Sequence, residues 1–138
     1  MLMKVFPHGT GEGDKPSRYL VRPDYPGRDT APPQILHGDL AMTRALIDSI
    51  ERRWKFTSGA LSWHPNDKVS EEQEEEVMDA FERVAFAGLE ADQRNILWVR
   101  HTHAGHHELH FLIPRLELSS GKDFNACPPG WQKDFDVF

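Results

Sequence analysis

Two apolar runs that enclose a histidine-rich segment, between Asn95 and Pro114, are the feature that most constrains the fold of this chain. Five of the eight histidines lie between residues 101 and 110, together with Glu108. Two short apolar runs on either side of a polar segment that contains glycine predict a β-hairpin. In a chain with a single cysteine, so many imidazoles beside a carboxylate indicate a metal site near the tip of that hairpin.

The alternation of side chains along a strand sharpens this prediction, because successive residues point to opposite faces of a sheet. Glu108 and His110 are therefore neighbours on one face of the second strand. The first strand presents one face through Leu97, Val99, His101 and His103. If the register allows, His101 meets Glu108 and His110 across the hairpin. Three such ligands leave coordination positions open, as a catalytic metal requires.

A histidine-rich loop tip can also be solvated and inert, or can bind metal adventitiously, so the pattern alone is a hypothesis. His106 is a weaker ligand candidate because it adjoins Gly105 at the expected turn. His107 is weaker because it points to the apolar face. His103 is kept as a candidate accessory base or additional ligand.

Composition indicates one domain of a water-soluble, cytoplasmic protein. The 138 residues have a mean hydropathy of −0.60, and no apolar run is long enough to cross a bilayer. The N-terminus has no secretory signal pattern, and Cys127 is alone, which excludes an intrachain disulfide and suits a reducing compartment. The net charge of −6 argues against a strong non-specific grip on nucleic acid.

The expected elements favour an α+β fold with a mostly antiparallel sheet and helices packed on one face. Strands are predicted at residues 2–7, 56–63, 96–101 and 108–113. Helices are predicted at residues 15–21 with Asp14 as N-cap, at 40–54 with Asp39 as N-cap, and at 70–87 behind a Ser70–Gln73 capping box. The acidic run 71–76 is expected to be a solvated helix start. The other sheet face would carry the metal residues.

Several segments, each weak alone, match one family in order along the chain: residues 4–13, 19–20, 35–39, 43–49, 57–62, 95–102 and 108–122. Together they resemble plasmid mobilisation relaxases of the HUH endonuclease superfamily, most like the branch carried by small colicin-type plasmids. The resemblance implies a relaxase-like nuclease domain at residues 1–122. Residues 123–138 are expected to form an irregular tail, either a natural short form or a truncated domain end.

This resemblance implies a metal-dependent transesterase that acts at one site and on one strand of single-stranded DNA. A tyrosine, matched here by Tyr19, would attack a phosphate at a plasmid transfer origin and leave a 5′-phosphotyrosyl enzyme and a free 3′-hydroxyl. The His-Glu-Asn metal set of this branch is matched by His101, Glu108 and His110. Because His110 replaces the asparagine, the preference for Mg²⁺ is expected to shift toward Mn²⁺. Accessory mobilisation proteins are possible partners.

Residues near the matched tyrosine are candidates for binding DNA. Lys15, Arg18 and Arg22 could contact phosphates. Trp131 could stack on a base or anchor the tail. The phenol of Tyr19 needs help to ionise, and a nearby cation, the metal or a histidine base such as His103 could give it.

Other functions stay open at this point. Without the resemblance, Tyr19 would be interpreted as a half-buried helix tyrosine. One alternative is a metal-dependent phosphodiester hydrolase that uses water and tolerates Tyr19→Phe. Another is a shortened relaxase relative that binds origin DNA as a regulator without cutting it.

Overall fold

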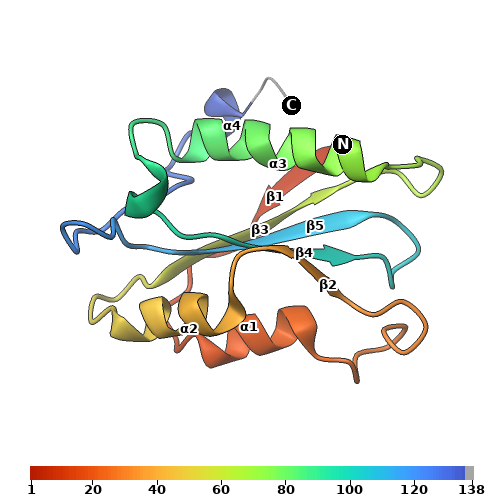
Figure 1. Cartoon of the computed structure of the whole chain (residues 1–138), viewed down its shortest axis with the longest axis horizontal. Helices are drawn as coiled ribbons and strands as arrows, with labels where there is room; N and C mark the ends of the chain where they lie inside the picture. The colour runs from red at the N-terminus through yellow and green to blue at the C-terminus, as the bar shows by residue number, and fades with distance from the viewer. Residues whose placement is uncertain (136–138) are drawn as a thin grey trace.

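A five-stranded antiparallel sheet with the strand order β1-β3-β5-β4-β2 organises the molecule, which a computed structural model describes for residues 1–135 (Figure 1). The strands are β1 (Leu2–Val5), β2 (Gln34–His37), β3 (Phe56–Ser62), β4 (Leu97–His101) and β5 (Glu108–Pro114). The helices are α1 (Asp14–Val21), α2 (Leu40–Ser49), α3 (Glu71–Ala85) and α4 (Trp131–Asp134), with a 3₁₀ turn at Ala91–Gln93. The α+β class and the hairpin are confirmed.

Helices cover both faces of this sheet, so the prediction that they pack on one face is wrong. In Figure 1, α3 lies above the sheet and α1 and α2 lie below it. Each face has its own buried cluster. The α3-face cluster includes Met78, Phe81, Trp98, Leu109 and Phe111. The α1-face cluster consists of Leu20, Ile47, Leu97, Val99 and Leu112. Strands β4 and β5 are buried on both sides. This explains why apolar residues occupy both the odd-numbered and the even-numbered positions of these strands.

Capping patterns in the sequence correctly predicted the starts of α2 and α3. Other helix and strand boundaries were predicted wrongly. The Asp39 side chain accepts a hydrogen bond from the Met42 amide, and the Ser70–Gln73 capping box is present. Helix α2 ends at Ser49 rather than residue 54, because Ile50 already has extended backbone angles. The N-cap of α1 is Gly13, not Asp14. Strand β2 was not predicted, because its four residues form a strand only by pairing with β4.

The segment after Lys122 is mostly irregular in its backbone, but it packs into the core as far as residue 135. Ala126, Cys127 and Phe135 are buried in the α3-face cluster, and Trp131 packs against it. Helix α4 adds one helical turn. Residues 136–138 of the predicted tail lie outside the described residues.

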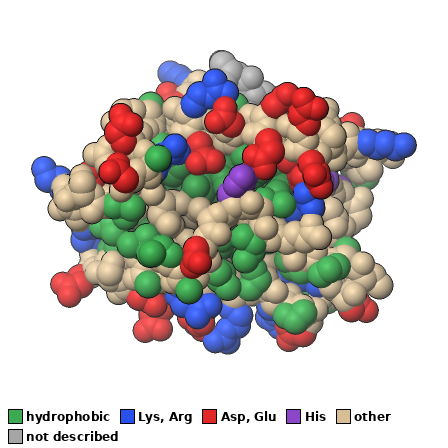
Figure 2. Space-filling view, in the orientation of Figure 1, with side chains coloured by type: hydrophobic (Ala, Val, Ile, Leu, Met, Phe, Trp, Pro, Cys, Tyr) green, Lys and Arg blue, Asp and Glu red, His purple; other side chains and the backbone are tan. Residues whose placement is uncertain are grey.

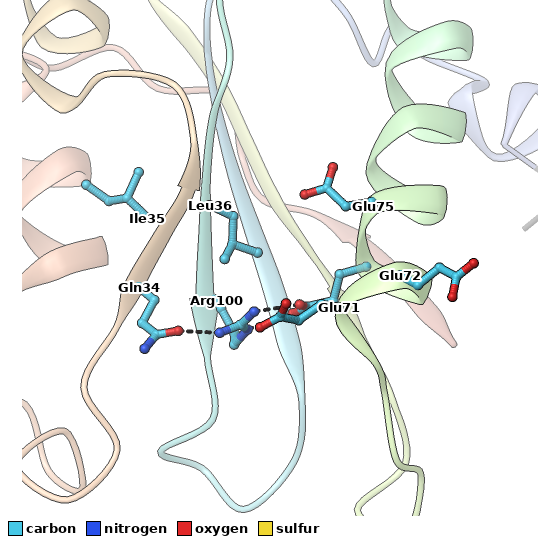
Figure 3. A pocket seen from close by; sticks show the side chains of 8 residues that line it. Gln34, Ile35, Leu36, Glu71, Glu72, Glu75 and Arg100 are labelled. Atoms are coloured by element: carbon cyan, nitrogen blue, oxygen red, sulfur yellow. Dashed lines mark hydrogen bonds and ion pairs between the residues drawn. The ribbon is translucent and has the colours of Figure 1, made fainter.

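One carboxylate of the acidic run is buried, contrary to the expectation of a fully solvated helix start. Acidic side chains gather over α3 (Figure 2), but Glu74 is only 2% exposed. Arg100 of β4 donates to it through Nε at 2.7 Å and Nη2 at 2.6 Å, and His107 lies 2.6 Å away through Nε2. Figure 3 shows Arg100 between Gln34 and the acidic side chains of α3. These hydrogen bonds connect the β4–β5 hairpin to α3.

Replacing Glu74 by alanine is expected to destabilise the protein by roughly 3 kcal/mol, because it leaves Arg100 and His107 without their buried partner. Burial would raise the pKa of the Glu74 carboxyl, but the hydrogen bonds from Arg100 and His107 outweigh burial and lower it. The stability that Glu74 contributes is therefore present above the carboxyl's unfolded pKa and lost as the pH falls. Urea unfolding at neutral and acid pH measures both effects.

The exposed Glu72 offers a matched control on the same helix turn. Glu72→Ala should change the unfolding free energy by less than about 0.5 kcal/mol. Equal losses in the two variants would mean that the network contributes nothing beyond helix propensity.

Candidate active site

The β4–β5 hairpin brings together the three residues predicted as ligands. Its register pairs His101 directly with Glu108 and places Val99 opposite His110. One ligand atom from each of His101, Glu108 and His110 lies within 4.8 Å of the others. All three share one face of the sheet, as the alternation predicted, but this face is covered by α1 and α2, so the prediction of a face free of helices is wrong. Whether they bind a metal stays a prediction.

Two buried ring nitrogens support a metal at this cluster. His101 is 1% exposed, and its Nε2 donates to the Leu20 carbonyl at 2.7 Å. Its Nδ1 is buried without a hydrogen-bond partner among the described residues, and so is Nδ1 of His110. Buried polar atoms are normally paired. A backbone carbonyl that holds the other nitrogen is the usual second contact of a metal-binding histidine.

The protonation of the cluster also suits a cation. Burial, followed by the proximity of His110, lowers the pKa of His101 to about 4. This imidazole is therefore neutral at neutral pH, as a metal ligand must be. A hydrogen bond with His110 lowers the pKa of Glu108 to about 2 against the opposing effect of burial. The carboxylate is ionised, and His106 also contacts it at 2.9 Å.

Tyr19 of α1 lies beside the cluster. Its ring centroid is 6.1 Å from that of His101 and 6.5 Å from that of His110, and the residue is 38% exposed. Burial, with a smaller contribution from Tyr25, raises the pKa of Tyr19 although the charge of Arg28 acts in the opposite direction. Tyr19 therefore carries its proton at neutral pH, and any nucleophilic role needs a proton acceptor.

His103 borders the same site. Its ring lies 5.1 Å from the ring of His101 and 5.4 Å from that of Tyr25, centroid to centroid. Burial lowers the pKa of His103. The ring of Tyr25 in turn lies 5.6 Å from that of Tyr19. The structure thus places His103 next to two neighbours of Tyr19, although His103 is not part of the three-ligand cluster.

Comparison with known proteins identifies the family of the chain. Residues 31–134 match the family model described as relaxase, MobA/VirD2-like, nuclease domain. The chain belongs to this relaxase family. Since the family match begins after Tyr19, it covers the predicted ligands but not the predicted nucleophile.

Two curated relatives extend over more of the relaxase chain. It is 43% identical over 122 residues to cryptic plasmid protein C of Neisseria gonorrhoeae, which is 88% of this chain and 58% of that protein. It is 38% identical over 122 residues to DNA relaxase MbeA of Escherichia coli, which is 88% of this chain and 23% of that protein. The chain therefore spans less than two thirds of either relative. No solved structure shows a significant match.

The predicted DNA-binding residues of this relaxase domain lie in two separate places, on or just after α1 and on the α3 face of the sheet. Arg18 forms an ion pair with Asp14, and Arg22 forms one with Asp24 at 2.8 Å, both at the surface. Lys15 lies on the same helix. Trp131 packs against the α3-face cluster, so the structure does not bring it to Tyr19. No described helix is long and apolar enough to cross a membrane.

One residue of the site was not predicted. Arg28 is 1% exposed, and its guanidinium carbon lies 5.0 Å from the ring centroid of Tyr19 and 4.7 Å from that of Tyr25. It follows Gly27, which has a φ of +86°, in a loop whose sequence has no element pattern. Pro26-Gly27 signals a turn, but nothing local indicates that the next side chain is buried.

Divalent manganese is expected to raise the melting temperature of the wild-type protein, and Glu108→Gln should weaken the metal affinity by about 100-fold or more. Loss of an outer contact alone costs about 10- to 100-fold, and Glu108 would be a direct ligand of the predicted metal. Calorimetric titration of metal-free protein with Mn²⁺ and with Mg²⁺ measures both affinities.

His64→Ala provides the control, because His64 is an exposed histidine outside the cluster. It should leave the affinity unchanged. An equal loss in both variants, or binding that survives Glu108→Gln, would place the metal elsewhere.

Proposed function

We propose that this chain nicks and rejoins single-stranded DNA at a plasmid transfer origin, with Tyr19 as nucleophile and a divalent metal bound by His101, Glu108 and His110. The observation that carries the proposal is the position of Tyr19, whose ring lies about 6 Å from two histidines of the cluster. The relaxase family and the relative named DNA relaxase MbeA support it.

In the proposed reaction, the phenol of Tyr19 gives its proton to a base while its oxygen attacks the scissile phosphorus. A bond forms between this oxygen and phosphorus, and the bond from phosphorus to the 3′-oxygen breaks. The 3′-oxygen takes up a proton and leaves as a hydroxyl, while the 5′-phosphate stays on Tyr19. The diester is retained, so the returning 3′-hydroxyl can reverse the step. A bound metal would neutralise charge on the phosphate oxygens in the transition state.

The protein's own groups have separate tasks in this scheme. Helix α1 directs Tyr19 toward the cluster, since Leu20 next to it accepts the His101 hydrogen bond. We assign the accessory base to His103, because its lowered pKa keeps it unprotonated and its ring lies beside Tyr25 and His101. Lys15, Arg18 and Arg22, on or just after α1, would contact phosphates of the flanking strand.

The donor set favours Mn²⁺ over Mg²⁺ because two imidazoles suit a transition metal better than a cation that prefers oxygen ligands. The substrate places the protein in the bacterial cytoplasm, where plasmid DNA is found. Accessory mobilisation proteins would act with it at the origin.

A covalent protein–DNA adduct is the expected product when the protein, Mn²⁺ and a randomised pool of single-stranded DNA are incubated together. It should resist SDS, disappear with EDTA and map to Tyr19 by mass spectrometry. Tyr19→Phe should give no adduct because it lacks the nucleophilic oxygen, whereas Tyr25→Phe should still form one.

Two other outcomes would replace the proposal. DNA scission without an adduct, retained in Tyr19→Phe, would indicate a hydrolase that uses water. Sequence-selective DNA binding without scission in the metal-loaded protein would indicate a regulator.

A further inference from the structure

Arg28 carries a buried positive charge that is in no direct ion pair among the described residues. The guanidinium keeps its proton under all ordinary conditions. Among residues 1–135 it forms no ion pair, and Asp24, one of the two acids in the same loop, pairs with Arg22. Burying an unpaired charge is costly. The two tyrosine rings on which the guanidinium packs compensate only part of that cost.

One nitrogen of Arg28 is used by the end of helix α1. Its Nη1 donates to the carbonyls of Tyr19 and Arg22. Carbonyls in the last turn of a helix lack partners within the helix and carry partial negative charge, so this contact is favourable. It also fixes the guanidinium beside the backbone of the proposed nucleophile.

The opposite edge of the guanidinium is free. Nε and Nη2 of Arg28 are buried and have no hydrogen-bond partner among the described residues. These two nitrogens form the edge that binds two oxygens of a carboxylate or phosphate side by side. A fixed fork of unused donors with an uncompensated charge has the chemistry of an oxyanion site.

The two aromatic neighbours of Arg28 lie at the protein surface. Tyr19 and Tyr25, which pack on Arg28, are each 38% exposed and therefore lie at the surface. The loop beneath is held firmly, because Gly27 approaches the His103 backbone so closely that an added Cβ would lie 2.9 Å from its carbonyl oxygen. An anion would reach the fork from the side on which these two surface rings lie.

We propose that Arg28 is an oxyanion-binding residue that holds the phosphate group bonded to Tyr19 after strand cleavage. The presence of a phosphate site at Nε and Nη2 follows from the geometry of the loop. The identity of its physiological occupant, the phosphodiester on Tyr19, rests on the proposed function. In this role Arg28 stabilises the cleaved covalent state relative to rejoined DNA.

The first test uses inorganic phosphate and metal-free protein in EDTA, so it does not depend on catalysis. Thermal unfolding is followed across a series of sodium phosphate concentrations and in sodium chloride at matched ionic strength. Phosphate is expected to raise the melting temperature of the wild type more than chloride does. The extra rise should be lost in Arg28→Gln, which has no charge, and reduced in Arg28→Lys, which has no fork.

Arg53→Gln is the matched control, because Arg53 also packs on an aromatic ring, that of Trp54 at 4.7 Å, but is exposed. It should keep the full phosphate response. No phosphate effect beyond chloride in the wild type overturns the proposal and requires no variant to fold. A response that persists in Arg28→Gln overturns it too, since the phosphate then binds elsewhere.

The second test measures the fraction of DNA held as adduct at equilibrium. Arg28→Lys is expected to lower this fraction by about tenfold, as the loss of one charge-assisted hydrogen bond implies. A purely structural role would slow cleavage and rejoining together and leave the fraction unchanged, which would overturn the proposal.

The two tests separate this proposal from the proposed function. A phosphate response without any adduct in the wild type supports the Arg28 site and contradicts the transesterase. An adduct without a phosphate response contradicts the Arg28 site and supports the transesterase.

Discussion

The hydrogen bond from His101 to the Leu20 carbonyl connects the two halves of the site. It pairs a carbonyl at the end of α1 that has no helical partner, and it fixes which ring nitrogen of His101 is left for a cation. Because Leu20 follows Tyr19, the same contact helps to set the distance between Tyr19 and the cluster. A change in the position of α1 would therefore disturb the His101 ring and the tyrosine together.

The hairpin that carries the cluster is held from both sides of the sheet. On the α1 face, His101 is tied to Leu20; on the α3 face, His107 is tied to the buried Glu74. His107 directly precedes Glu108, so the α3 network restrains the backbone that presents this carboxylate. The tip of the β4–β5 hairpin is only half-buried, but these two contacts hold its side chains in fixed positions. Such preorganisation is what a reactive site needs.

Alternation along strands was sufficient to predict that His101, Glu108 and His110 lie together, because both strands of the hairpin are regular and the register places His101 opposite Glu108. Predictions from local sequence patterns failed where contacts between segments that are distant in the sequence determine the structure. Strand β2 exists only through its pairing with β4. Helices cover both faces of the sheet because β4 and β5 carry apolar side chains on both faces. Arg28 could not be found from sequence, since a loop arginine is normally solvated and its burial depends on two tyrosine rings and the hairpin backbone.

The distribution of charge explains how an acidic protein can act on DNA. The acidic side chains of α3 lie over one face of the sheet, and the cluster and Arg28 lie on the other. A net charge of −6 precludes strong non-specific attraction to phosphate at long range. Attraction at short range would come from a bound cation and from one buried guanidinium, both shielded from salt by their burial. In the proposed mechanism, affinity is therefore concentrated at the scissile phosphate, where it stabilises the covalent state rather than the approach of DNA.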